Sequence, residues 1–326
     1  MTIQGLSLDS IRDAAGALRG KVHRTPLLSS QTLSARSGHR LLMKAENLQK
    51  TGSFKPRGAF NRIRRLTADE RARGVLAASA GNHSQGLAWA AVAQGVPVTV
   101  VMPAMAQQAK IDATRGMGAQ VILHGEIFDD ALVRALAIRD ETGMTFVHPC
   151  IDPDVLSGAG TIGLEILEDC PEVDAIVVPI GGGGLISGIA TAVKALAPRV
   201  RVFGVEPATA PAMKRSMDEG KLVTLETARS IADGMAGRSV FAETLGICRR
   251  HVEDVLLVSE ESMLEAIVAL LTRCKLLTEA AGAAGVAATL NGLVPVAPGS
   301  TIVAVLSGGN QDMGTLATWL TRGLTS

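Results

Sequence analysis

Short apolar runs alternate with helix-length segments from residue 74 to residue 310. Each run is about as long as a strand and shows little polar/apolar alternation, which is typical of strands that are buried on both faces. Strand, helix and strand in succession predict crossover connections and a doubly wound parallel α/β sheet. The runs are GVLAASA (74–80), VPVTVVMP (96–103), AQVILHG (119–125), MTFVHP (144–149), VDAIVVPI (173–180), VRVFGVEP (200–207), VEDVLLVSE (252–260) and STIVAVLSGGN (300–310).

Two breaks interrupt this pattern. TADE at 67–70 has the spacing of a capping box, and HPCIDPDVLSGAG at 148–160 is punctuated by Pro and Gly with little periodicity. We interpret the block between them as a smaller α/β lobe inserted into a larger domain. The predicted domains are a large cofactor-binding domain at 1–70 and 150–326 and a small substrate-loop domain at 71–149.

Composition narrows the class of partner. The formal net charge is +1, only 2% of residues are aromatic, and there is no Tyr. The charges are scattered, so nucleic acid and membrane surfaces are disfavoured as partners. We therefore expect a small-molecule substrate.

The cysteines and the amino terminus indicate the compartment. Cys150, Cys170, Cys248 and Cys274 lie far apart and form no CxxC pair, which favours free thiols over structural zinc or a disulfide scaffold. The first twenty residues have helical spacing rather than the charged and apolar blocks of a signal peptide. We expect a cytoplasmic protein.

The stretch KTGSFKPRGAF at 50–60 predicts a tight loop that enters a helix. Pro56 fits the first turn of a helix, where its missing N–H would have no partner in any case. Lys55 then lies where the loop becomes a helix. Alone, such a lysine is almost always a solvated surface charge, so the rest of the chain has to support a catalytic role.

Three turns follow predicted strands, and ligands of open α/β sheets bind beyond the carboxyl ends of strands. SAGNH at 79–83 begins a helix, whose free N–H groups suit a carboxylate or a phosphate. Four consecutive glycines at 181–184 suggest backbone N–H groups brought close to a phosphate. SGGN at 307–310 places the hydroxyl of Ser307 at a strand end.

A dinucleotide site is the main competing interpretation of the glycines, because Glu206 ends the next strand where an acid could hold a ribose. The G-x-G-x-x-G pattern fails in both registers, which place Ile186 or Ser187 at the third position. A phosphate cradle, a carboxylate loop, a hydroxyl and a lysine together predict a pyridoxal 5′-phosphate site. Lys55 would form the Schiff base, because an amine is required for an imine with the cofactor aldehyde.

On these motifs the chain resembles the fold-type II pyridoxal-phosphate enzymes, in the branch of serine/threonine dehydratases (ammonia-lyases) and serine racemase. SFKPRGA resembles the Schiff-base motif of that family, SAGNH its substrate loop, GGGGL its phosphate loop and SGGN its pyridine-nitrogen turn. The order and spacing agree along nearly the whole chain. The resemblance implies a tryptophan synthase beta-like fold and, in many relatives, a homodimer.

Carried over by residue, the resemblance implies a role for each motif. Lys55 would bind the cofactor and take the substrate Cα proton. The predicted cofactor-binding residues are Phe54, Lys55, Asn82, Gly181, Gly182, Gly183, Gly184, Leu185 and Ser307. The predicted substrate-binding residues are Ser79, Ala80, Gly81, Asn82 and His83.

Departures from the family pattern refine the expected activity. Ala80 stands where the racemase has a serine that acts as the second acid, which favours elimination over racemisation. Glu206 matches the first acid of the family's cation site, but Ala212 replaces the second, so we predict no metal site. Phe128 and two acids occupy the helix start where relatives that use a second carboxylate tend to carry a basic residue.

Further differences concern the cofactor wall and the end of the chain. Ala280 and Ala281 replace the Pro-Ser/Thr that the family often has, which would reshape the wall behind the cofactor. No regulatory tail follows in this sequence, so feedback inhibition is not expected.

We therefore predict an L-threonine and/or L-serine ammonia-lyase that forms a 2-oxo acid and ammonia by β-elimination. A serine racemase, or a dehydratase of 3-hydroxyaspartate or phenylserine, remains the nearest alternative, because Arg134 or Arg238 could reach a second carboxylate. A nicotinamide-dependent oxidoreductase and a non-catalytic binding protein are more distant alternatives.

Overall fold

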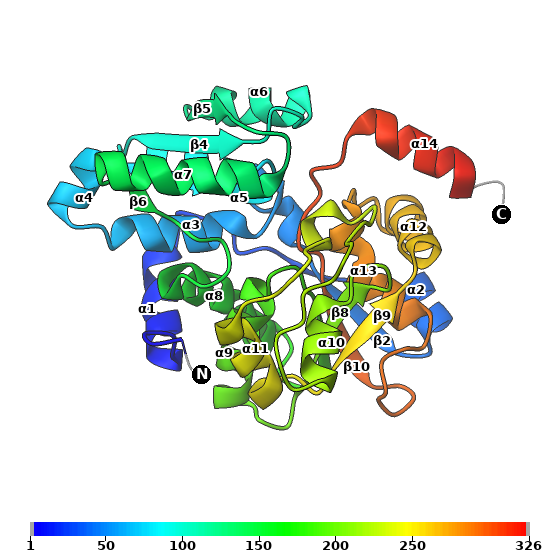
Figure 1. Ribbon diagram of the computed structural model, residues 1–326. Helices are drawn as coiled ribbons and strands as arrows, with labels where there is room; N and C mark the ends of the chain where they lie inside the picture. Colours follow the sequence, from blue (N-terminus) through cyan, green and yellow to red (C-terminus); the bar gives the residue numbers. More distant parts are fainter. Residues whose placement is uncertain (1–2, 324–326) are drawn as a thin grey trace.

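The computed structural model describes residues 3–323 and contains two sheets (Figure 1). The six-stranded sheet has the order β1-β2-β10-β7-β8-β9, and the four-stranded sheet has the order β5-β4-β3-β6. The strands are β1 (Leu27–Ser29), β2 (Arg40–Lys44), β3 (Val75–Ala78), β4 (Val98–Met102), β5 (Gln120–Leu123), β6 (Thr145–Phe146), β7 (Ala175–Pro179), β8 (Arg201–Pro207), β9 (Asp254–Val258) and β10 (Thr301–Val305).

Helices surround both sheets. The α-helices are α1 (Leu8–Leu18), α2 (Gln31–Ser37), α3 (Lys55–Arg64), α4 (Ala68–Arg73), α5 (Asn82–Val92), α6 (Gln108–Gly116), α7 (Phe128–Thr142), α8 (Pro153–Asp169), α9 (Gly184–Leu196), α10 (Ala212–Asp218), α11 (Ala242–His251), α12 (Glu260–Ala269), α13 (Ala280–Leu290) and α14 (Met313–Gly323). Short turns are η1 (Glu46–Leu48), η2 (Lys50–Gly52), η3 (Asp233–Met235) and the π-helical η4 (Leu270–Cys274). None of the helices in the described range is long and apolar enough to cross a membrane.

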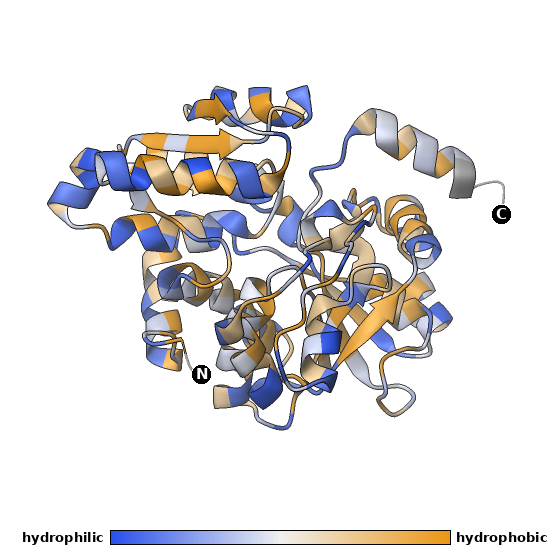
Figure 2. Cartoon of the chain, in the orientation of Figure 1, coloured by the Kyte–Doolittle hydropathy of each residue, from blue (hydrophilic) through white to orange (hydrophobic). Residues whose placement is uncertain are grey.

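The strand predictions from residue 74 onward are confirmed, since each apolar run contains one strand. Successive residues of the large sheet face opposite cores: Val177 packs toward α12 and α13, whereas Ile176 and Val178 pack toward α8 and α9. Both faces are therefore covered, which explains the absence of alternation in the sequence. Figure 2 shows hydrophobic strands beside helices of mixed polarity such as α7.

Two features of the fold were not predicted. β1 and β2 precede the repeating pattern and extend the large sheet, with β1 antiparallel to β2. The break at 148–160 contains the start of α8, because Asp152 caps the helix and Pro153 occupies its first turn. Gly158 lets α8 approach α3 closely, since a Cβ there would lie 2.4 Å from the carbonyl oxygen of Arg57.

The four-stranded sheet is built from strands between residues 75 and 146, and the six-stranded sheet from strands before and after them. Helix α3 packs against α5 on one side and α8 on the other, so it joins the two parts. The predicted capping box at 67–70 is present at the start of α4, where Thr67 and Glu70 each accept the other's backbone N–H. The domain boundaries themselves stay a prediction.

Candidate active site

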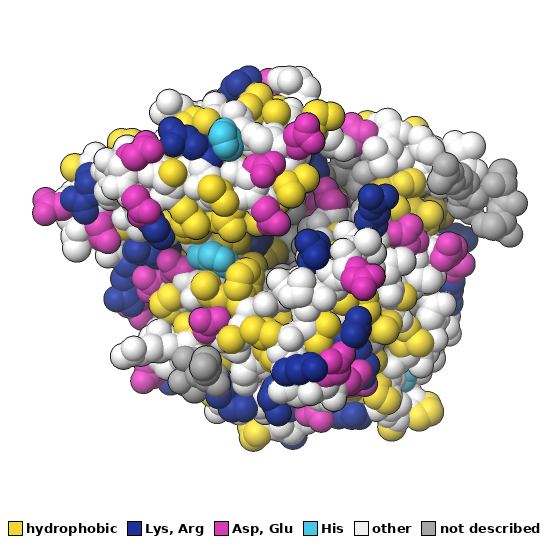
Figure 3. All heavy atoms as spheres, in the orientation of Figure 1, with side chains coloured by type: hydrophobic (Ala, Val, Ile, Leu, Met, Phe, Trp, Pro, Cys, Tyr) yellow, Lys and Arg dark blue, Asp and Glu magenta, His cyan; other side chains and the backbone are white. Residues whose placement is uncertain are grey.

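A cavity of about 410 Å³ lies between the two sheets, beyond the carboxyl ends of β3, β7 and β10. Figure 3 shows the surface hollowed between the two parts of the molecule, with acidic and basic side chains intermixed around it. All the predicted site residues line this cavity: Phe54, Lys55, Ser79, Ala80, Gly81, Asn82, His83, Gly181, Gly182, Gly183, Gly184, Leu185 and Ser307. Segments far apart in the sequence therefore meet at one place.

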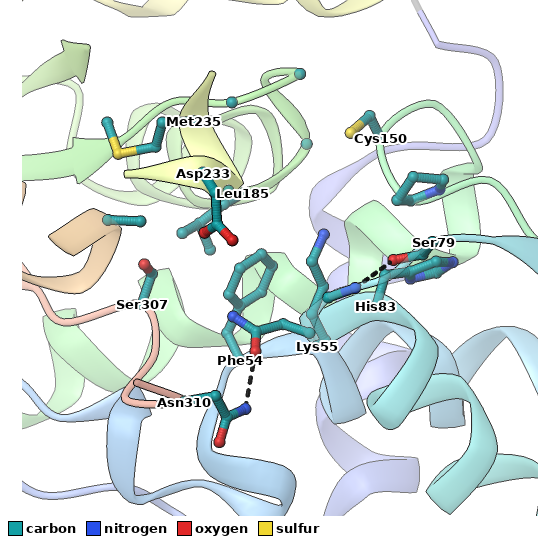
Figure 4. A pocket seen from close by; sticks show the side chains of 18 of the residues that line it. Phe54, Lys55, Ser79, His83, Cys150, Leu185, Asp233, Met235, Ser307 and Asn310 are labelled. Carbon is teal, nitrogen blue, oxygen red and sulfur yellow. Dashed lines mark hydrogen bonds between the residues drawn. The ribbon is translucent and has the colours of Figure 1, made fainter. Parts of the chain in front are cut away.

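Lys55 begins helix α3, with Pro56 in the first turn as the sequence predicted. Figure 4 shows its side chain rising into the cavity, with Ser79 and His83 on one side and Ser307 and Asn310 on the other. Its Nζ lies 4.8 Å from the centroid of the Phe54 ring. Burial of the amine lowers the pKa of Lys55, which favours the neutral, nucleophilic form.

The lysine loop is held against the turn that follows β10. The N–H of Phe54 donates to the carbonyl of Ser307 at 3.1 Å, and the N–H of Gly309 donates to the carbonyl of Gly52 at 2.9 Å. Gly52 has a φ of +69°, in the left-handed region that favours glycine. These bonds fix the position of the turn that carries Ser307 relative to the loop that carries Lys55.

The SAGNH turn links β3 to α5, with Gly81 as the N-cap and Asn82 as the first helical residue. Backbone N–H groups in the first turn of a helix have no intrahelical partner, so they can bind a carboxylate. The Nε2 of His83 lies 2.9 Å from the carbonyl oxygen of Val147. Burial is the main cause that lowers the pKa of His83 to about 3, so the imidazole is neutral and donates this bond.

Asn82 is held by two side chains from other segments. Its Nδ2 donates to Glu279 at 2.7 Å, and its Oδ1 accepts from Nδ2 of Asn310 at 2.8 Å. Asn310 also donates to the carbonyl of Thr51 at 2.7 Å. Burial raises the pKa of Glu279 to about 7. The amide of Asn82 thus has a defined orientation toward the cavity before any ligand binds.

The four glycines form the turn between β7 and α9. Gly183 is the N-cap of α9 with a φ of +90°. A Cβ would lie 2.5 Å from the carbonyl oxygen of Gly234 at Gly181, and 2.6 Å from Sγ of Cys150 at Gly182. Side chains are therefore excluded, and the backbone N–H groups at the helix start form a cradle suited to an anion.

Several residues considered in the sequence lie outside the cavity. Arg134 pairs with Glu141 on α7, and Nε of Arg238 donates to the carbonyl of Leu225. Glu206 accepts the backbone N–H groups of Met213 and Lys214 at the start of α10, a helix that begins with Ala212, so this carboxylate is already occupied. Among residues 3–323, no group of three or more acidic, His or Cys side chains could hold a metal ion.

The cavity also contains functional candidates that the sequence analysis did not assign: Lys110, Cys150, Asp233, Glu279 and Asn310. Asn310 ends the SGGN turn, Glu279 directly precedes Ala280 and Ala281, and Cys150 lies in the break at 148–160. Their positions in those segments could have identified them. Lys110 lies on α6 and carries no such signal.

The geometry agrees with comparisons with known proteins. The family described as "Pyridoxal-phosphate dependent enzyme" matches residues 18–308. An L-threonine ammonia-lyase of Thermotoga maritima is 47% identical over 98% of this chain and 79% of the relative.

Solved structures support the same relationship. The processed form of threonine deaminase isoform 2 from Solanum lycopersicum has a TM-score of 0.93 and 33% identity, covering 100% of this chain and 92% of that chain. A maize serine racemase has a TM-score of 0.93 and 36% identity, covering 98% of each chain.

Proposed function

This chain belongs to the pyridoxal-phosphate dependent enzymes, and we propose that it is an ammonia-lyase acting on L-threonine and L-serine. The products are a 2-oxo acid and ammonia. The observation that carries the proposal is the meeting of Lys55, the SAGNH turn, the four glycines and Ser307 in one cavity. The predicted fold and cofactor are those of the family, and the nicotinamide alternative is set aside.

The residues present fit pyridoxal phosphate. The glycine cradle, which has no room for side chains, would hold the phosphate group of the cofactor. Lys55 would hold the cofactor through its amine. Phe54 would contact the ring face, Asn82 the phenolic oxygen, and Ser307 the pyridine nitrogen. When bound, the cofactor supplies an electron sink beside the substrate Cα.

Lys55 and the SAGNH turn divide the remaining work. The free N–H groups at the start of α5 would bind the substrate carboxylate and orient the Cα–H bond. The Nζ of Lys55, in a surrounding that favours its neutral form, would take the Cα proton. Loss of the β-hydroxyl as water follows, and hydrolysis of the released enamine product yields the 2-oxo acid and ammonia.

The cavity favours a substrate with one carboxylate. Phe128 lines it, whereas neither Arg134 nor Arg238 does. An uncharged side chain such as that of threonine or serine avoids placing a second carboxylate near an apolar ring.

Racemisation is the second candidate, because maize serine racemase shares the fold. Ala80, which by the family resemblance takes the place of the racemase's second acid, lines the cavity, and its methyl group has no proton to give. Incubation with L-serine in heavy water tests this: we expect pyruvate to form faster than D-serine. Faster accumulation of D-serine would contradict the preference for elimination.

The first experiment compares the purified protein with Lys55→Ala. The wild type should show an absorbance band at about 410–430 nm and release 2-oxo acid from threonine or serine, and the variant should lose both. Lys50→Ala is the matched control, since Lys50 lies in the same loop but outside the cavity. Retention of band and turnover by Lys55→Ala would refute the assignment.

We further propose a homodimer in the cytoplasm and a division into domains at 71–149 and the remainder. The two separate sheets support the division, and the four cysteines, all free thiols, are consistent with a reducing compartment. Light scattering during size-exclusion chromatography would measure the oligomeric state.

A further inference from the structure

A pair of opposite charges spans the mouth of the cavity. Nζ of Lys110, on α6 beside the small sheet, lies 2.7 Å from Oδ2 of Asp233, in η3 beside the large sheet. Both residues line the cavity, and Figure 4 shows the carboxylate of Asp233 pointing into it above Phe54. The Lys110 side chain is 27% exposed and that of Asp233 is 71% exposed, so an incoming ligand can meet both.

The other charged groups along the cavity wall have different partners. Lys55 is at the proposed cofactor site, and Glu279 is hydrogen-bonded to Asn82. Among the described residues that line the cavity, Lys110 is therefore the cation that can still meet a substrate side chain, and it is paired with Asp233. The charges of both residues act on the carboxyl of Glu279, which places the pair within electrostatic range of the cavity interior.

We propose that the Lys110–Asp233 pair determines substrate specificity: Lys110 is a latent receptor for a second substrate carboxylate, and Asp233 keeps it closed. This inference rests on the proposed function. A dicarboxylate such as 3-hydroxyaspartate meets the negative charge of Asp233 and finds the ammonium already paired. A substrate without a second charge, such as threonine, is not penalised, so the pair discriminates mainly by repulsion.

Removing the negative charge tests the proposal. In Asp233→Asn, the ratio of kcat/KM for threo-3-hydroxyaspartate to that for L-threonine should rise at least about tenfold, because Lys110 is released. In Lys110→Met, the ratio should fall, because Asp233 is left unpaired. The double variant Lys110→Met/Asp233→Asn should lose the gain. Glu253→Gln is the control, since it breaks the Lys194–Glu253 pair at a position outside the cavity lining.

Binding gives a readout without turnover. Calorimetric titration of the holoenzyme with L-aspartate and with L-2-aminobutyrate compares a dicarboxylate with a monocarboxylate that carries no β-hydroxyl. We expect Asp233→Asn to improve the affinity for aspartate relative to aminobutyrate by about tenfold, and the double variant to abolish the improvement.

The inference would be overturned if the kcat/KM ratio and the affinity ratio both stayed within about twofold of the wild type in Asp233→Asn and Lys110→Met. It would also be overturned if the gain persisted in the double variant. Failure of the proposed function is distinguishable, since the wild type would then turn over neither threonine nor serine. The binding comparison still decides the role of Lys110 in that case.

Discussion

Arg57 is the centre of a buried charge network that fixes the helix carrying Lys55. It lies two residues after Lys55 in α3, and its side chain is 1% exposed. Its Nε and Nη2 each lie 2.8 Å from an oxygen of Glu46, a residue whose side chain is fully buried. Its Nη1 lies 2.6 Å from Oε1 of Glu165 on α8, so the guanidinium joins β2–η1, α3 and α8.

We expect Arg57→Met to destabilise the protein by about 3–5 kcal/mol, because it leaves the carboxylate of Glu46 buried without its cation. At about 2.1 cal/mol/K per residue, unfolding of 326 residues carries an entropy of about 0.7 kcal/mol/K, so the melting midpoint should fall by about 4–7 °C. Although burial opposes ionisation of Glu165, bonds and charge from Arg57 lower its pKa. The part of the loss that comes through Glu165 should therefore be present above about pH 4.5 and shrink below it.

Differential scanning calorimetry of the holoenzyme measures this shift, with Arg24→Met as the control. Arg24 also bridges two carboxylates, Glu168 and Asp169, but its side chain is 50% exposed. Its loss should cost less than about 1 kcal/mol. Equal losses of stability in Arg57→Met and Arg24→Met would contradict this explanation, whereas partial recovery of stability in Glu46→Gln/Arg57→Met would support it.

Two further predictions concern the site. In Gly86→Ala the new Cβ would lie 2.8 Å from Cβ of Lys55, so we expect a loss of stability of about 1–3 kcal/mol and a weaker cofactor band. The control is Gly16→Ala, in open space on α1, which should stabilise the protein by about 0.5–1 kcal/mol. Equal melting midpoints and spectra in the two variants would contradict this expectation. The pKa of Glu279 is raised from 4.5 to about 7, so the stability that its protonated form contributes is present below about pH 4.5 and lost as pH rises through 7. Glu279→Gln should therefore show a smaller fall in melting midpoint between pH 5 and pH 8 than the wild type, and an unchanged fall would argue against burial as the cause.

The motifs that meet in the candidate site could be predicted from local patterns. Pro56 in the first turn of a helix, the SAGNH turn after a strand and the four glycines each have a conformational reason that is visible in a few residues. Lys110 could not be found in this way, because its importance comes from Asp233, more than a hundred residues later in the chain. β1 and β2 escaped prediction because they come before the alternation of strand and helix is established.

Hydrophobic period and turn chemistry are local signals, so they were enough to predict the class of the fold, the strands from β3 onward and the residue types proposed to hold the cofactor. Which of these residues line one cavity, and which charged side chains line it with them, depends on how the chain folds in three dimensions. Arg238 donates to a backbone carbonyl outside the cavity, whereas Lys110 meets Asp233 at its mouth. Two charged groups interact strongly over a few ångströms of space, and the number of residues between them in the chain does not reveal that distance.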